Sequence, residues 1–342
     1  MKKSIVLSLC CSLSAIVTIA QMPQSNLPRF VRWIDGNQVV VNKKLNNDKA
    51  AKDYVYNIAT KQYSEAPAVA ASNDKAVIIK NANLFLKSNG TETQLTFDPA
   101  EEKNPTLSPD GKYVGYTKNN NLYTLNLEDK KEVAITNENT KGVLNGYASW
   151  VYFEEIFGRP TQYRAFWWSP DSKFISFMRF DERNVPMFPI YNSDGQHGFI
   201  EETRYPKVGD PNPTVKIGWV APTGGNITWA DFNDQDDQYF GWPIWNPNNN
   251  SMWLSWMDRG QNNLKIYELD MASGKKKEVY KEYQKTWIDL EDRVSGRINF
   301  LANNKGYIAQ SDASGWNQLN LYDMNGQLIN AITAGKYTVT GI

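Results

Sequence analysis

Two adjacent glutamates, Glu154 and Glu155, have the residue type and the setting that suit the binding of a cation. They stand in a short aromatic-rich segment that runs from Trp150 to Phe157. A pair of carboxylates in partly apolar surroundings is unfavourable unless a cation compensates it. A ligand ammonium would do so, because one charged hydrogen bond contributes about 1.5–3 kcal/mol. The segment therefore predicts a site for a positively charged group, on a short helix or irregular turn that Ser149 would cap.

A Glu-Glu dipeptide is weak support by itself. Glu101-Glu102 and Glu201-Glu202 also occur in the chain, and most such pairs are solvated surface. No other residues complete a catalytic set, because Gly-x-Ser-x-Gly is absent and the single histidine, His197, stands in a turn-like composition. We therefore expect no catalytic residues, no metal site and no cofactor in this chain.

The composition indicates the class of protein that must position the glutamates. Hydrophobic residues make up 41% and aromatic residues 13%, a load that suits an all-β fold. Lysine plus arginine and aspartate plus glutamate balance at 37 each, which leaves no electrostatic footprint for nucleic acid. We expect no nucleic-acid partner.

The first twenty residues have the pattern of a secretory signal peptide. Lys2 and Lys3 precede an apolar stretch that runs from Ile5 to Ala20. Cleavage after Ala20 would leave a mature chain of residues 21–342, exported to the periplasm or secreted. Both cysteines lie in residues 1–20, so the mature chain would contain neither a disulfide nor a thiol nucleophile.

A repeated unit of a polar turn followed by β-rich runs organises the rest of the chain. Gly36, Asp74 and Gly111 mark three such turns, spaced 38 and 37 residues apart. Strands predicted to follow the turns are 38–41, 76–79, 113–116, 174–177, 252–256 and 307–308. A second strand is predicted at 54–58, 122–127, 265–269 and 319–323. This period predicts a β-propeller with about six blades or part-blades, rather than a β-sandwich.

Two insertions interrupt the repeat. One lies at about 143–165 and contains the glutamate pair, and the other lies between Asp181 and Ala230. Insertions in a repeat protein leave the ring as loops, where function usually resides.

The residues around the glutamates resemble the dipeptidyl-peptidase IV family, within the prolyl oligopeptidase superfamily. The resemblance rests on Trp150 to Phe157, on Trp167-Trp168-Ser169-Pro170-Asp171, and on Phe180 to Pro186. It continues through Arg204 to Lys216 and covers most of the chain. The resemblance implies the N-terminal region of an eight-bladed propeller, incomplete here, and a catalytic serine, aspartate and histidine in a C-terminal α/β-hydrolase domain that this chain lacks.

The resemblance also implies the function. Glu154 and Glu155 would hold the free α-ammonium of a peptide, so that a serine exopeptidase removes X-Pro or X-Ala dipeptides. The expected partners are peptides with a free N-terminus, the covalently attached hydrolase domain and, because family members are often dimers, a second copy. This chain alone would be inactive. Two alternatives stay open: the propeller of a prolyl tripeptidyl peptidase, and a non-catalytic exported propeller that binds peptides or glycans.

One feature of the family pattern is missing. Family members use an arginine from an early blade near the substrate carbonyl, and the stretch from Lys75 to Glu92 contains none. Lys80 and Lys87 lack the planar fork of an arginine. Arg159 and Arg164 lie near the glutamates in sequence, and a salt bridge within the insertion is the favoured role for both.

Overall fold

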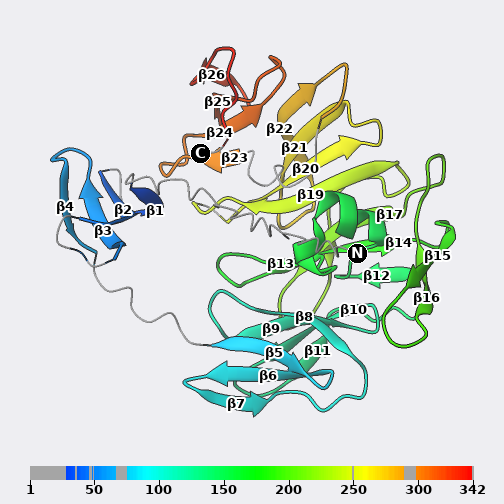
Figure 1. The fold of residues 1–342 in the computed structure, drawn as a ribbon. Helices are drawn as coiled ribbons and strands as arrows, with labels where there is room; N and C mark the ends of the chain where they lie inside the picture. Colours follow the sequence, from blue (N-terminus) through cyan, green and yellow to red (C-terminus); the bar gives the residue numbers. More distant parts are fainter. Residues whose placement is uncertain are drawn as a thin grey trace, which may run out of the picture. The chain divides into compact units, whose positions relative to one another are not determined.

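The computed structural model describes residues 28–34, 37–45, 48, 50–66, 75–248, 250–288 and 298–340. The predicted signal peptide (1–20), Gly36 and Asp74 lie outside these residues. The chain divides into two compact units, Met1–Asn73 and Asp74–Ile342. In the described part of the chain, the strands form six blade-like sheets and one separate two-stranded hairpin (Figure 1).

The first unit holds one four-stranded antiparallel sheet, whose strands follow each other in sequence order. Sheet 1 contains β1 (Arg29–Trp33), β2 (Gln38–Lys43), β3 (Lys52–Asn57) and β4 (Gln62–Glu65). Val39, Val41 and Tyr54 are its buried apolar cluster.

The second unit holds the other five sheets, which follow one another along an arc in Figure 1. Sheet 2 contains β5 (Ala76–Lys80), β6 (Asn83–Ser88) and β7 (Thr91–Gln94). Sheet 3 contains β8 (Glu102–Leu107), β9 (Tyr113–Lys118), β10 (Asn121–Asn126) and β11 (Glu132–Ala134). Sheet 4 contains β12 (Val143–Asn145), β13 (Phe166–Trp168), β14 (Ile175–Asp181), β17 (Thr214–Val220) and β18 (Thr228–Trp229).

Sheets 5 and 6 repeat the four-stranded pattern. Sheet 5 contains β19 (Gln238–Trp245), β20 (Met252–Asp258), β21 (Asn263–Leu269) and β22 (Lys276–Tyr283). Sheet 6 contains β23 (Ile298–Phe300), β24 (Gly306–Ser311), β25 (Gln318–Asp323) and β26 (Leu328–Ala331). The helical elements are η1 (Tyr152–Ile156) and η2 (Arg159–Thr161). Among the described residues, no helix has the length and apolar character needed to cross a lipid bilayer.

The predicted pairs of strands form antiparallel hairpins. β2 pairs with β3, β9 with β10, β20 with β21, and β24 with β25. Each begins within about two residues of its predicted position, because polar turn residues end one strand and alternating apolar residues begin the next. The all-β propeller prediction, with about six blades, is confirmed.

Apolar clusters join each sheet of the second unit to the next one. Leu84 of sheet 2 packs with Val114 of sheet 3, and Leu122 of sheet 3 packs with Phe177 of sheet 4. The largest cluster joins sheets 4 and 5, and a further cluster joins sheets 5 and 6. Neither face of a small sheet can be buried by that sheet alone, so this stacking supplies the core that a single blade lacks.

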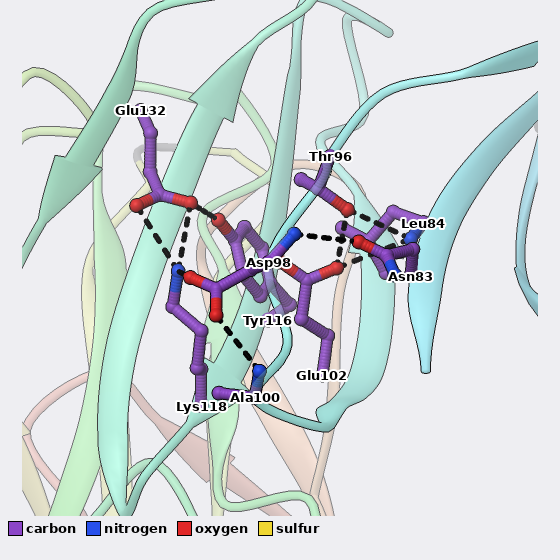
Figure 2. Close-up of polar contacts among 9 residues, drawn as sticks. All are labelled: Asn83, Leu84, Thr96, Asp98, Ala100, Glu102, Tyr116, Lys118 and Glu132. Carbon is purple, nitrogen blue, oxygen red and sulfur yellow. Dashed lines mark hydrogen bonds and ion pairs between the residues drawn. The ribbon is translucent and has the colours of Figure 1, made fainter. Parts of the chain in front are cut away.

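A buried lysine of sheet 3 pairs with a carboxylate of its own sheet and with one of the segment that connects sheets 2 and 3 (Figure 2). The side chain of Lys118 is 6% exposed, and its Nζ lies 2.8 Å from Asp98 and 3.1 Å from Glu132. The hydroxyl of Tyr116 donates to the same Glu132 carboxylate. A buried lysine is tolerated because these two carboxylates compensate its charge.

Glu102, next to this group, corrects an expectation from the sequence. Its dipeptide was expected on the solvated surface, yet Glu102 is fully buried. Its Oε2 accepts hydrogen bonds from the hydroxyl of Thr96 and the backbone N–H of Leu84, while Oε1 has no partner among the described residues (Figure 2). Burial raises the pKa of Glu102, and the charge of Lys118 opposes this shift.

Candidate functional site

The loop that carries the glutamate pair interrupts the edge of sheet 4. β12 and β13 both pair with β14, and the chain between them leaves the sheet. Its two ends are held together, since the Ala165 N–H donates to Gly146 O at 2.9 Å and both residues bond to the backbone of Met178. Gly146 has φ of 69°, and a Cβ there would lie 3.2–3.3 Å from Leu122 and Thr117. We call residues 146–165 the anchor loop.

Tyr152 fixes the short helical turn η1 to the core. It is 1% exposed and packs against Phe157 and Phe180. Its hydroxyl oxygen accepts a hydrogen bond from the backbone N–H of Phe240 on β19 at 3.1 Å. The predicted cap is wrong: the Oγ of Ser149 is buried and has no partner among the described residues. The turn is therefore positioned by the buried tyrosine rather than by a side-chain cap.

Both glutamates project from η1, and their carboxylates differ in surroundings. Glu154 is 23% exposed; its Oε1 accepts from Arg159 Nε at 2.9 Å and Nη2 at 2.6 Å. Its Oε2 is buried and has no hydrogen-bond partner in the described part of the chain. Glu155 is exposed and forms no ion pair within the described residues. The pair therefore retains acceptor capacity for a ligand cation.

An aromatic stack begins at Phe153, the residue before Glu154. The ring of Phe153 lies 3.8 Å from that of Tyr163, which in turn stacks on Tyr147 at 5.0 Å. Burial, together with the charges of Glu201 and Glu154, raises the pKa of Tyr163 to about 12. The charges of Glu201 and Glu154 thus act on this stack, and the positive charge of Arg159 opposes them.

Glu182 adds to these negative charges and was not singled out from the sequence. Burial raises its pKa to about 7, while Arg204, with Nε at 3.9 Å from Oε1, opposes the shift. The charge of Glu182 also acts on Tyr147 and Tyr163. No sequence signal marks Glu182, Tyr147 or Tyr163, because their proximity results from the pairing of β12 and β14.

The two arginines of the anchor loop have different roles. Arg159 forms the expected salt bridge within the insertion, to Glu154. Arg164 does not: its Nη1 donates to Thr106 Oγ1 at 3.2 Å, and no carboxylate lies within ion-pair distance among the residues described. Lys80 and Lys87, which lie where the family's arginine was expected, both pair with Glu92.

Other side chains considered from the sequence lie away from this site. His197 is exposed in the turn between β15 (Met187–Asn192) and β16 (Phe199–Arg204), as predicted. That hairpin forms the separate two-stranded sheet, within the second predicted insertion.

Comparisons with known proteins agree with this architecture. Residues 99–342 match the family model described as dipeptidyl peptidase IV (DPP IV) N-terminal region. A dipeptidyl peptidase 4 from Arthroderma otae is 32% identical over 277 residues, covering 76% of this chain and 35% of that protein. The dipeptidyl peptidase 4 of Trichophyton rubrum is 30% identical over 277 residues, with 76% and 35% covered.

The fold also matches a solved structure. The crystal structure of Porphyromonas gingivalis dipeptidyl peptidase 4 gives a TM-score of 0.67 at 23% identity, covering 92% of this chain and 48% of that one. The chain spans about a third of the length of the curated relatives it matches. Because the family model covers more than half of its residues, this chain belongs to the family defined by the N-terminal region of dipeptidyl peptidase IV.

Proposed function

We propose that this chain is the substrate-anchoring propeller region of an exported serine exopeptidase that removes dipeptides from peptide N-termini. In this proposal Glu154 and Glu155 bind the α-ammonium of the substrate, and the hydrolysis takes place in an attached α/β-hydrolase domain. Anchoring the N-terminus would determine how many residues reach the nucleophile. Relatives named dipeptidyl peptidases support the reaction class.

The observation that carries the proposal is the buried, unpartnered Oε2 of Glu154. A buried carboxylate oxygen without a donor is unfavourable, and a substrate ammonium would supply that donor. Arg159 does not remove this need, because it contacts Oε1 and is itself 69% exposed. An exposed ion pair contributes at most about 1 kcal/mol, so a ligand cation can compete with it.

The test compares the full-length protein with its Glu154→Gln and Glu155→Gln variants. Each should lower kcat/KM for Gly-Pro-nitroanilide by about ten- to hundredfold, the loss of one charged hydrogen bond. Glu202→Gln, on exposed strand β16, is the matched control and should leave kcat/KM unchanged. Equal wild-type activity on free and N-acetylated substrates would contradict the anchoring role.

The same assay distinguishes the length of the released product. Gly-Pro-nitroanilide should be cleaved faster than Ala-Ala-Pro-nitroanilide, because the anchor would leave room for two residues. The opposite preference would indicate a tripeptidyl peptidase. Absence of hydrolysis of both substrates by the full-length protein would indicate a binding propeller instead.

A further inference from the structure

A cavity beside the anchor loop lies between η2 and the edges of sheets 2 and 3. It has a volume of about 440 Å³, within the usual range of small-molecule sites. Its walls come from β5, from residues 104–106 of β8, and from η2 with the residues that follow it. The lining residues are Val77, Ile78, Ile79, Asn104, Pro105, Thr106, Pro160, Thr161, Gln162 and Arg164. Glu154 and Glu155 are not among them.

Arg164 brings an uncompensated positive charge to this cavity. A guanidinium carries five N–H donors, and the described residues account for one of them, from Nη1 to Thr106. Its Nε is buried and has no partner among those residues. Burial lowers the pKa of Arg164, and no neighbouring carboxylate counteracts the shift. An arginine in partly buried surroundings is normally paired with an anion.

Asn104 adds a second unsatisfied donor. Its Nδ2 is buried without a partner in the described part of the chain. It stands at a bulge of β8, where the register with β9 shifts and φ is 59°. The bulge takes Asn104 out of the regular pairing with β9, and Asn104 lines the cavity. Arg164 and Asn104, from two different elements, thus both line one cavity, and each has a donor without a partner among the described residues.

Five of the ten lining residues are apolar, and Thr106, Thr161 and Gln162 add neutral polar groups to Asn104 and Arg164. Val77, Pro105 and Pro160 surround the cavity, and Ile79 is 42% exposed at its edge. Among the lining residues, Arg164 alone carries a charge. A phosphate would require more positive charge than one guanidinium, whereas a carboxylate matches the planar fork of an arginine. The cavity therefore suits one carboxylate carried on an aliphatic body.

We infer that this cavity binds an aliphatic carboxylate, with Arg164 and Asn104 as donors and β5 as the apolar wall. The site is separate from the glutamate pair, and it does not depend on the proposed exopeptidase activity. Ligands would be small aliphatic acids or the C-terminal leucine-like residue of a peptide, since both present the same chemistry.

Calorimetry on the full-length protein tests the inference. N-acetyl-leucine represents the small aliphatic acids, and the blocked peptide N-acetyl-Ala-Ala-Leu represents the peptide C-termini. Because their N-termini are acetylated, neither compound has the ammonium that would bind Glu154 and Glu155. At least one should bind, and its C-terminal amide should bind about tenfold more weakly or worse, the loss of a charge-assisted contact. Equal binding of acid and amide, binding of neither acid, or tighter binding of inorganic phosphate would overturn the inference.

Two variants locate the binding. Arg164→Gln should weaken the acid by about tenfold, and Asn104→Asp should do the same because it places a like charge beside the ligand. Aspartate tolerates the positive φ at position 104, so Asn104→Asp should fold. It therefore tests the site even if Arg164→Gln does not fold. Arg183→Gln removes an exposed arginine paired with Asp181 and should have no effect. A raised KM for Gly-Pro-nitroanilide in Arg164→Gln, with acid binding intact, would assign Arg164 to the substrate and overturn the inference.

Discussion

Glu182 illustrates how burial changes a single titratable side chain. Its pKa is raised from 4.5 to about 7, mainly by burial, although Arg204 lies nearby. Between pH 4.5 and about pH 7, the folded state binds more protons at Glu182 than the unfolded state does. The free energy of unfolding therefore decreases as pH rises. The stabilisation associated with neutral Glu182 is complete below about pH 4.5 and is lost as pH rises through about 7.

We predict that Glu182→Gln removes this pH dependence. The variant should match the wild type in urea denaturation at pH 4.5 and should be more stable than the wild type at pH 8, because no buried charge forms. Glu202→Gln, on the exposed strand β16, should follow the wild type at both pH values. Parallel pH profiles of Glu182→Gln and the wild type would show that solvent reaches this carboxylate.

At the scale of elements, the anchor loop depends on the closure of its two ends. Gly146 accepts from Ala165 and donates to Met178, which places both ends of the loop on β14. A side chain at Gly146 would meet Leu122 and Thr117 and would also be strained by its φ of 69°. The position of Glu154 and Glu155 thus depends on a residue eight positions earlier in the chain.

We predict that Gly146→Ala destabilises the protein by about 1–3 kcal/mol, from strain and close contacts together. Gly195→Ala is the matched control, because Gly195 has φ of 78° and no atom within 4 Å of the added Cβ. Gly195→Ala adds backbone strain without close contacts, so its loss of stability should be smaller than that of Gly146→Ala. Thermal denaturation measures both. A loss at Gly195 equal to that at Gly146 would mean that the contacts with Leu122 and Thr117 contribute nothing.

At the scale of the molecule, the second unit is held together by what each sheet shares with the next. Apolar clusters provide these contacts, and Lys118 adds charged contacts within sheet 3 and with the segment that connects sheets 2 and 3. Lys118 is buried, whereas the Asp98 side chain is 34% exposed and that of Glu132 is 36% exposed, so water solvates part of both partner charges. Asp98 and Glu132 both face Lys118.

We predict that Lys118→Met lowers the free energy of unfolding by about 1–3 kcal/mol, because the charged hydrogen bonds to Asp98 and Glu132 are lost while water partly solvates these carboxylates. Lys103→Met, a lysine 43% exposed beside Glu101, is the control and should lose at most about 1 kcal/mol. Urea denaturation followed by tryptophan fluorescence measures both. Similar losses for the two variants would show that water screens the Lys118 cluster.

Local periodicity determined much of this protein. Alternating apolar residues after polar turns located β2, β9, β20 and β24 and the strands that pair with them, because these hairpins are built from residues close in sequence. The aromatic segment likewise marked Glu154 and Glu155, although their role stays a prediction. The exposed turn of His197 followed from composition alone.

Only the tertiary structure decided which distant residues meet. The burial of Glu102 depends on Leu84 and Thr96, in a neighbouring sheet and the segment after it, so its dipeptide looked like ordinary surface. Ser149 has the composition of a cap, yet Tyr152 positions the turn through a bond to β19, 88 residues away. Arg164 and Asn104 share a cavity because β8 bulges beside the anchor loop. Such contacts join segments that no local pattern relates, because sheet stacking brings them together.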